Sequence, residues 1–220
     1  WGIITVCIHR TDQSHDVKIA FLPMTCSDTL PSKDLWIAFA LPYMISNHLS
    51  QQCDPDMLII SYESTYRSVP VDSINSVQYI AQLHRLTNVD LFIYSELDIA
   101  ADEYTFSYQI RSGLESQNES SLTFATGNLL RSVEQVVADL YSILSSGDAM
   151  HREFKHSDDL TALSYFFNGI LEKINGSGDK AFDYFQKTIS RDSSFAMAYT
   201  LASECLFNDA VDTYMDGNSG

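Results

Sequence analysis

The hydrophobic pattern of this chain changes once, near residue 147. Before that point, short apolar runs typical of strands alternate with stretches in which apolar residues recur every three or four positions, as on one face of a helix. Beyond it, every pattern has the helical spacing, and the stretch "GDAMHREFKHSDD" at the change is polar and charged. We therefore predict an α/β unit over residues 17–147 and an all-α unit over residues 148–220.

Within the first unit we predict the order β-α-β-α-β-β-β-α, which corresponds to a mixed sheet backed by helices. The clearest strand covers residues 104–112, where apolar and polar side chains alternate, so one face can meet water. The helix expected over residues 34–49 contains Pro42, which should kink or break it. The other predicted strands are residues 17–24, 57–62, 89–97 and 121–127. The other predicted helices are residues 72–86, 128–146, 159–174, 178–190 and 195–207, the last with a continuation toward residue 214. Residues 114–120 are predicted to be a loop.

Acidic residues outnumber basic ones, since 29 Asp and Glu stand against 13 Lys and Arg and give a net charge of −16. Nucleic-acid binding depends on basic residues that displace the counterions of phosphates, and an anionic membrane surface repels an acidic protein. The charge therefore argues against direct DNA or RNA binding and favours cations, polyamines, protons or other proteins as partners. The alternative is that the acidity only keeps the protein soluble.

The sequence contains no motif of a catalytic or cofactor site. It has no G-x-S-x-G, no P-loop, no G-x-G-x-x-G, and no H-E-x-x-H among its six histidines. We expect no cofactor and no bound metal, and we predict a binding function and not an enzyme.

The four cysteines lack the spacing of a zinc site. A helix of ~15 residues spans about 22 Å, so a continuous helix between Cys26 and Cys53 keeps them too far apart for a disulfide. Cys7 and Cys53 would lie at the same edge of the sheet and are the better candidate pair. Cys205 is predicted to be a buried helix residue. Nothing nearby would activate the thiol of Cys26, and the sequence leaves open whether it is unpaired or linked to a partner.

Two stretches concentrate ionisable side chains. The predicted turn "ELDIAADE" would contact a cation or sense protons, because clustered carboxylates attract positive charge and raise each other's pKa; the alternative is a polar turn. The stretch between the two units also contains histidine, which titrates near physiological pH. A change of its charge on acidification would shift the packing of the two units at this hinge. The alternative is a solvated linker in which Asp158 caps the next helix. The candidate residues are Glu96, Asp98, Asp102 and Glu103 in the first stretch and His151, Glu153, His156, Asp158 and Asp159 in the second.

The helical unit resembles a tetratricopeptide repeat. In such repeats small and large residues interlock two antiparallel helices, and here Tyr165 is followed by Gly169, while Ala181 is followed by Phe185. The chain departs from the pattern where the repeat usually has Ala and Pro, at Thr188 and Ser193.

The first unit is similar to the sheet part of a known family of sensors. "VKIAFLPM" resembles an opening strand written "IAVLPF", with Ser27-Asp28 in the following loop, and "NVDLFIYSELDIAADEYTFSYQI" corresponds to the strand-turn-strand "VDYVLEGSVR…G…R…V…Q". Together with the repeat-like helices, this order resembles the extracytoplasmic region of CadC-type, ToxR-like transmembrane transcription regulators, and the sheet part also resembles the N-terminal domain of TolB-like proteins. The turn lacks the glycine-rich, arginine-containing hairpin of that family.

The resemblance implies an extracytoplasmic sensing domain of a single-pass inner-membrane transcription activator. It would respond to pH, a small cationic molecule or a protein partner in the periplasm, as a homodimer or with that partner, and its DNA-binding domain would precede this sequence. The first 16 residues, beginning "WGIITVCIHR", would then be the end of a membrane helix or a linker, or alternatively an ordinary strand. The alternative function is a tetratricopeptide-type protein-interaction module without a small-molecule signal.

Overall fold

The structure is a computed structural model that describes residues 17–27, 30–52, 57–70, 72, 74, 76–100, 103–112, 115–145 and 157–217. Short 3₁₀ helices are labelled η. Along the chain the elements are β1 (Val17–Phe21), β2 (Thr25–Cys26), η1 (Ser32–Asp34), α1 (Leu35–Gln52), β3 (Met57–Ile60), α2 (Tyr62–Ser68), α3 (Val77–Thr87), β4 (Leu91–Ala100), β5 (Glu103–Ser112), β6 (Glu115–Ala125), η3 (Thr126–Asn128), α4 (Leu129–Leu144), α5 (Leu160–Ile174), α6 (Gly178–Arg191) and α7 (Ala196–Gly217).

In the described ranges the strands form one mixed sheet of six strands. The path is β3-β1-β4-β5-β6, and the short β2 lies beside β4. β1 pairs in parallel with β3 and β4, whereas β5 pairs antiparallel with β4 and β6. The predicted mixed α/β fold followed by helices is therefore confirmed, with β4 as the strand where parallel pairing gives way to antiparallel pairing.

The sheet is larger than the sequence pattern suggests. β6 begins at Glu115, so the loop predicted over residues 114–120 is wrong, and β2 has no counterpart among the predicted strands. β6 pairs with β5 along its length, for example at Gln109 and Glu119, through backbone hydrogen bonds. Those bonds need no apolar side chains, so the first part of this edge strand, residues 115–120, has none of the alternation by which strands are recognised.

Two helix boundaries also differ from the prediction. The second strand ends at Ile60, and α2 then begins at Tyr62, within the residues predicted as strand. The next helix begins at Val77 and not near residue 72, because Ser76 caps it: its hydroxyl accepts a hydrogen bond from the Tyr79 N–H at 3.3 Å.

Pro42 does not break α1, which continues from Leu35 to Gln52. A proline inside a helix removes a backbone hydrogen bond and costs about 3 kcal/mol. Here the helix is buried on most of its surface, with Ile37, Met44 and Leu49 each fully inaccessible to solvent. Tertiary packing of this kind outweighs a local preference against helix.

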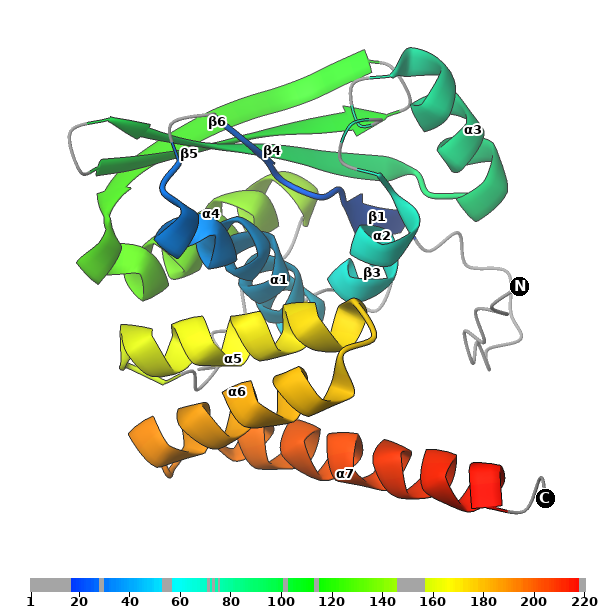
Figure 1. Cartoon of the computed structure of the whole chain (residues 1–220). Helices are drawn as coiled ribbons and strands as arrows, with labels where there is room; N and C mark the ends of the chain where they lie inside the picture. The colour runs from blue at the N-terminus through cyan, green and yellow to red at the C-terminus, as the bar shows by residue number, and fades with distance from the viewer. Residues whose placement is uncertain are drawn as a thin grey trace.

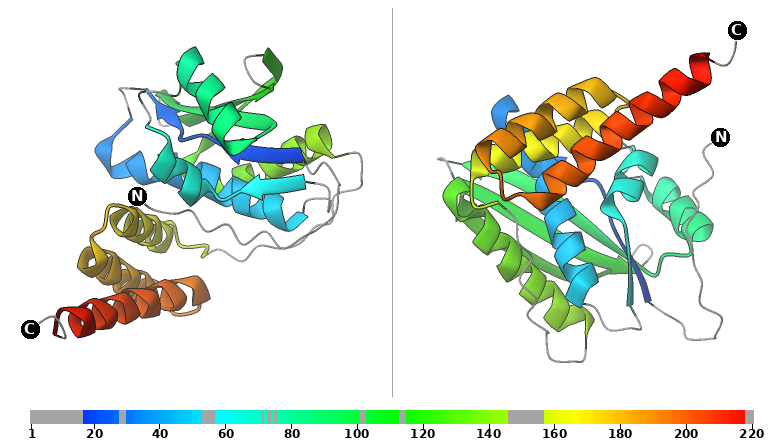
Figure 2. Two further views of the ribbon diagram at one scale, coloured as in Figure 1. Left: turned by 90° about the vertical axis from the view of Figure 1, so that its right-hand side faces the viewer. Right: turned by 90° about the horizontal axis from the view of Figure 1, so that it is seen from below.

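The molecule is built in layers. α1 and α4 lie on one face of the sheet, α5 packs on the far side of α1, and α6 and α7 follow below it (Figure 1). α3 covers the opposite face near β1 and β4, around the buried side chains of Ala20, Ile80 and Phe92 (Figure 2). Within the described part of the chain, no helix covers that face over β5 and β6, which leaves it open to solvent.

The hydrophobic core continues from the sheet into the helices. The rings of Trp36 in α1 and Phe167 in α5 stack with centroids 6.2 Å apart, and buried side chains of α5, α6 and α7 belong to the same core. The division into units at residues 147 and 148 stays a prediction, since the residues around it lie outside the described ones.

The contact between α5 and α6 has the small-to-large pattern that the sequence suggests. Gly169 lies against the ring of Phe185, so close that a Cβ at residue 169 would be 2.6 Å from the ring carbon Cε1. The turn between the helices contains Gly176 at φ 79°, a left-handed conformation that favours glycine. The three predicted helices are confirmed, and the last one extends to Gly217.

None of the helices in the described ranges is both long and apolar enough to cross a membrane. The predicted membrane exit in residues 1–16 lies outside the described residues, as do Cys7 and Cys53 of the candidate disulfide.

Candidate functional site

The open face of the sheet holds the first acidic group predicted from the sequence. Glu96 and Asp98 are exposed residues of β4 on one side of that strand, paired with Ser107 and Thr105 of β5. Glu103 begins β5 and is also exposed. Because side chains alternate along a strand, these three carboxylates share the face that points away from α1 and α4. Asp102, the fourth predicted member, lies outside the described residues.

A polar depression of about 220 Å³ lies on this face beside Glu96. Its cation is Arg111, whose guanidinium lies 4.3 Å above the ring of Tyr94 and donates hydrogen bonds to Gln109. Glu119 of β6 is a second carboxylate on the lining. The depression therefore offers acceptors to a small cation and one guanidinium to an anionic group.

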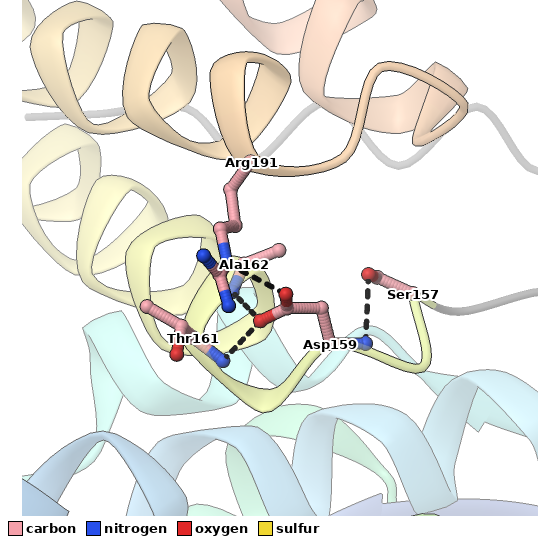
Figure 3. A network of polar contacts seen from close by, with 5 residues as sticks. All are labelled: Ser157, Asp159, Thr161, Ala162 and Arg191. Atoms are coloured by element: carbon pink, nitrogen blue, oxygen red, sulfur yellow. Dashed lines mark hydrogen bonds and ion pairs between the residues drawn. The ribbon is translucent and has the colours of Figure 1, made fainter.

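The second predicted group is divided between described and undescribed residues. His151, Glu153 and His156 lie outside the described ones, so their predicted role stays untested. Asp159, and not Asp158, caps α5: its carboxylate accepts hydrogen bonds from the backbone N–H of Thr161 at 2.8 Å and of Ala162 at 3.1 Å (Figure 3). Asp158 is one residue too early, since a capping side chain must reach the N–H groups two or three positions later.

Asp159 also joins two helices. The Nε of Arg191, at the end of α6, donates to its carboxylate at 2.6 Å (Figure 3). The hydrogen bond from Ala162, followed by the bonds from Arg191 and Thr161, lowers the pKa of Asp159 below its usual value. Its carboxylate therefore stays charged at neutral pH, and its role in sensing stays a prediction.

The structure does not bring the two acidic groups together. Glu96 lies on the open face of β4, whereas Asp159 begins α5, which packs beyond α1 on the opposite side of the sheet. In the described ranges, moreover, no three His, Cys, Asp or Glu side chains are arranged so that they could hold a metal ion.

The two described cysteines are free thiols. Cys26 lies in β2, and burial, with a smaller contribution from Glu96, raises its pKa to about 11. A thiol with this pKa stays protonated at neutral pH and is a poor nucleophile. The expectation that nothing activates Cys26 agrees with this environment. Cys205 is buried in α7, as predicted.

One buried titratable residue was not singled out from the sequence. His48 lies in α1 with 7% of its surface exposed, and burial lowers its pKa to about 4. The apolar neighbours of its helix, which are visible in the sequence, are the only signal that could have marked it as buried.

The most unusual surface belongs to α7, which is apolar on two opposite sides. One side packs toward α6 through Ala198, Ala202 and Cys205, which are exposed by no more than 7%. The other side, which we call the outer α7 face, carries large apolar side chains in solvent. Its members are Tyr199 (45% exposed), Leu206 (54%), Phe207 (67%), Val211 (41%) and Tyr214 (71%).

The end of α7 projects beyond its neighbour. α7 has 22 residues and α6 has 14, which at 1.5 Å per residue corresponds to roughly 33 and 21 Å. The last turns of α7 therefore extend past α6, as Figures 1 and 2 show. A hollow of about 520 Å³ lies between the middle of α7, at residues 205–209, and the turn from α5 to α6, and Leu206 and Phe182 are among its lining residues.

Sequence reasoning extended α7 toward residue 214 but did not identify its outer face. The signal is present: Tyr199, Leu206, Phe207 and Tyr214 follow helical spacing on one side, while the alanines at residues 198 and 202 follow it on the other. A helix that is apolar on two opposite sides usually lies between two neighbours.

A mixed α/β sheet followed by three helices defines the class of fold, and comparisons with known proteins add little to it. No protein-family profile matches the chain, and no curated protein matches it. Similar solved structures include TolB from Acinetobacter baumannii (17% identity, TM-score 0.42) and lipoprotein GNA1162 from Neisseria meningitidis (12%, 0.40). The LpoB C-terminal domain from Escherichia coli is a third (12%, 0.38).

These matches cover part of the chain. The match to TolB covers 61% of this chain and 29% of the TolB chain. The match to GNA1162 covers 59% of this chain and 99% of that protein, and the match to LpoB covers 53% and 88%. The matched part is thus less than a third of the TolB chain. At these identities and TM-scores the similarity carries no functional argument, and the resemblance to CadC-type sensors has no counterpart among the structures named here.

Proposed function

We propose that this chain is a non-catalytic, extracytoplasmic protein-binding domain whose partner docks on the outer α7 face. The observation that carries the proposal is the exposure of Phe207 and Tyr214, at 67% and 71%, on a helix whose other side is already buried. The sheet with α1 and α4 supplies a rigid support, since the core continues from it into α5, α6 and α7.

The size of the outer α7 face supports a binding role. A buried Phe or Tyr removes about 150–250 Å² from water, so the exposed parts of Leu206, Phe207 and Tyr214 together amount to on the order of 400 Å². Apolar patches of this size on a monomer often have a function. At about 25 cal/mol per Å², covering such an area contributes roughly 10 kcal/mol before the costs of association are subtracted.

Site-specific photo-crosslinking tests the proposal. Benzoylphenylalanine placed at residue 207 of the full chain, in the cells that make it naturally, should yield one discrete protein adduct on illumination. The matched control is the same group at Ile143 of α4, which is also apolar and 38% exposed but remote from α7. Equal yields at both positions, or no adduct at residue 207, would contradict the proposal.

A second function is favoured by the shared face of Glu96, Asp98 and Glu103. We propose it as the finer alternative: the sensing domain of a membrane-anchored transcription activator, in which the acidic open face responds to pH or to a small cation. Two copies meeting through this face would bring like charges together, and protons or a diamine would relieve the repulsion.

Sedimentation and thermal unfolding of the full chain test this alternative. Both should change with added 1,4-diaminobutane at fixed pH, and between about pH 8 and pH 5, in the wild type. The variant Glu96→Gln/Asp98→Asn should respond less to the diamine. If oligomeric state and melting temperature do not respond to either condition, the sensing alternative is wrong, while the docking proposal is unaffected.

A further inference from the structure

We propose that the free edge of β6 pairs with an extended segment of a partner protein, and that a Lys or Arg side chain of this segment binds Asp139 of α4. The edge of β6 and the neighbouring side of α4 form what we call the β6–α4 groove, defined by Ser120, Ser121 and Leu122 of β6 and by Gln135 and Asp139 of α4. This groove lies on the sheet, and its role does not depend on the docking proposed for the outer α7 face.

The outer edge of β6 is long and unblocked. In the described ranges β6 pairs only with β5, and its 11 residues extend over roughly 37 Å at about 3.4 Å per residue. The outward backbone N–H and C=O groups of such a strand can pair with an added strand. Lys and Pro often block an edge against pairing, and β6 contains neither residue.

The hollow beside this edge has room for side chains. It has a volume of about 350 Å³ and lies between β6 and α4, which are neighbours on this side of the sheet (Figure 2). Side chains of a strand alternate between its two faces, so a segment paired with β6 would direct every second side chain toward α4. In recognition of this kind, main-chain hydrogen bonds give affinity and pockets for the alternate side chains give specificity.

The structure holds one carboxylate in place in this hollow. Oδ2 of Asp139 accepts hydrogen bonds from the hydroxyl of Tyr108 at 2.5 Å and from that of Ser120 at 3.1 Å. Burial, followed by the hydrogen bond with Asp139, raises the pKa of Tyr108, so its hydroxyl remains a donor at neutral pH. Among the described residues no hydrogen bond or ion pair reaches the other oxygen, Oδ1. The carboxylate is therefore oriented through one oxygen and can accept a ligand with the other.

The charge of Asp139 selects the side chain that enters the groove. No ion pair involves this residue in the part of the chain that the structure describes. Arg131, the cation of α4, lies eight residues earlier, or about 12 Å along the helix. A Lys or Arg of the partner would donate a charge-assisted hydrogen bond to Oδ1, which is roughly twice as strong as a neutral one. An acidic side chain at the same place would be repelled.

A second copy of this chain would not supply that cation through the same edge. Two β6 strands paired with each other would bring Glu115 and Glu119, and no Lys or Arg, to the two grooves. In a two-fold interface both subunits use the same surface, so the charge of Asp139 would stay uncompensated on both sides. A partner protein with a basic residue in an extended segment fits the groove better.

Three labelled peptides test the inference by fluorescence anisotropy with the full chain. They alternate Thr and Val, share a neutral solubilising tail, and differ only in the central residue, which is Lys, Gln or Glu. The Lys peptide should bind at least ~10-fold more tightly than the Glu peptide, and the ratio should shrink between about 50 and 500 mM salt. Hydrogen exchange, followed by mass spectrometry, should slow in β6 when the Lys peptide binds, and should not change in β3.

Two variants of α4 identify the group that reads the charge. Asp139→Asn keeps an acceptor oxygen for Tyr108 and Ser120 but removes the charge, so it should abolish the preference for Lys over Glu. Glu134→Gln is the matched control, because Glu134 is an exposed carboxylate of the same helix that does not line the hollow. It should leave the preference unchanged.

The outcomes decide each part of the inference. Equal affinity for the Lys and Glu peptides, or a preference that survives Asp139→Asn, overturns the role of the carboxylate. A Lys peptide with N-methyl groups on both edges of its backbone should not bind, and unchanged binding overturns strand addition. Absence of binding by all three peptides, or a dimer in sedimentation that the Lys peptide dissociates, overturns the proposed partner. None of these results affects the crosslinking expected at residue 207 of α7.

Discussion

Replacing Gly169 by alanine should destabilise the protein, although alanine is the better helix former. The new Cβ would lie 2.6 and 2.9 Å from the ring carbons Cε1 and Cδ1 of Phe185. Carbon atoms pack best at about 3.5–4.0 Å, so the ring must move by nearly 1 Å. Phe185 is fully buried, and its ring lies 5.9 Å from that of Phe166, which limits this movement.

Two opposing effects set the magnitude. Overpacking of a core costs about 1–3 kcal/mol, whereas Ala in place of Gly inside a helix returns about 1 kcal/mol. We therefore expect Gly169→Ala to lower the free energy of unfolding by roughly 1 kcal/mol, measured by urea denaturation followed by circular dichroism. Gly178→Ala is the matched control, since a Cβ there would meet no atom within 4 Å, and it should not lose stability.

A double-mutant cycle identifies the cause. Phe185→Leu removes the ring atoms that the new Cβ would touch, so Gly169→Ala should be harmless or stabilising in that background. If Gly169→Ala is as stable as the wild type, or if its cost is the same with Leu at residue 185, the packing explanation is refuted.

Three further predictions concern single groups. Burial lowers the pKa of His48 to about 4, so the unfolded chain takes up a proton at this residue first as the pH falls below about 6.5. Between about pH 8 and 5 the wild type should therefore lose roughly 2 kcal/mol more of its free energy of unfolding than His48→Gln. Equal losses in the two proteins would contradict this. Because its pKa is raised to about 11, Cys26 should react with iodoacetamide at about pH 8 at least ~100-fold more slowly than an exposed cysteine does. Mass spectrometry of the peptide that contains Cys26 follows the reaction. Equal labelling of the native and the urea-unfolded protein would show that the thiol is accessible and activated. Asp159→Ala should lower the melting temperature more than Asp159→Asn, because asparagine keeps a capping oxygen. Since the pKa of Asp159 is lowered in the folded protein, the stability that its carboxylate contributes should disappear only as the pH falls below about 4. Identical melting temperatures for both variants would argue against the cap.

The sequence predicted the order of the long elements, without β2 and α2, because long apolar patterns report burial. Residues 104–112 alternate so regularly that only a half-exposed strand explains them, and the structure places β5 at residues 103–112. The three final helices follow from the same kind of evidence. The first half of β6 was missed because backbone pairing at a sheet edge leaves no apolar signature in "ESQNES", whereas its second half was predicted as a strand. The continuity of α1 through Pro42 escaped because tertiary burial overrides local preference.

The candidate site was predicted less well. Glu96, Asp98 and Glu103 were chosen as neighbours in sequence, and the strand register places them on one open face. The distance between this group and Asp159 depends on which side of the sheet α5 occupies, and no pattern in the sequence determines that. The outer α7 face was missed because helical apolar residues are normally assigned to a core, and exposure of one side becomes visible only when the neighbours are in place.

A crosslinking scan along α7 gives the sharpest test of the docking surface. Benzoylphenylalanine is placed in turn at each position from 203 to 211 of the full chain, in the cells that make it, and the yield of the adduct is plotted against residue number. The proposed docking predicts maxima at residues 203, 206, 207 and 210, the three-to-four residue spacing of one helical side, with minima at residues 205 and 208. A flat profile, or maxima on the side of α7 that packs toward α6, would contradict a partner on the outer α7 face.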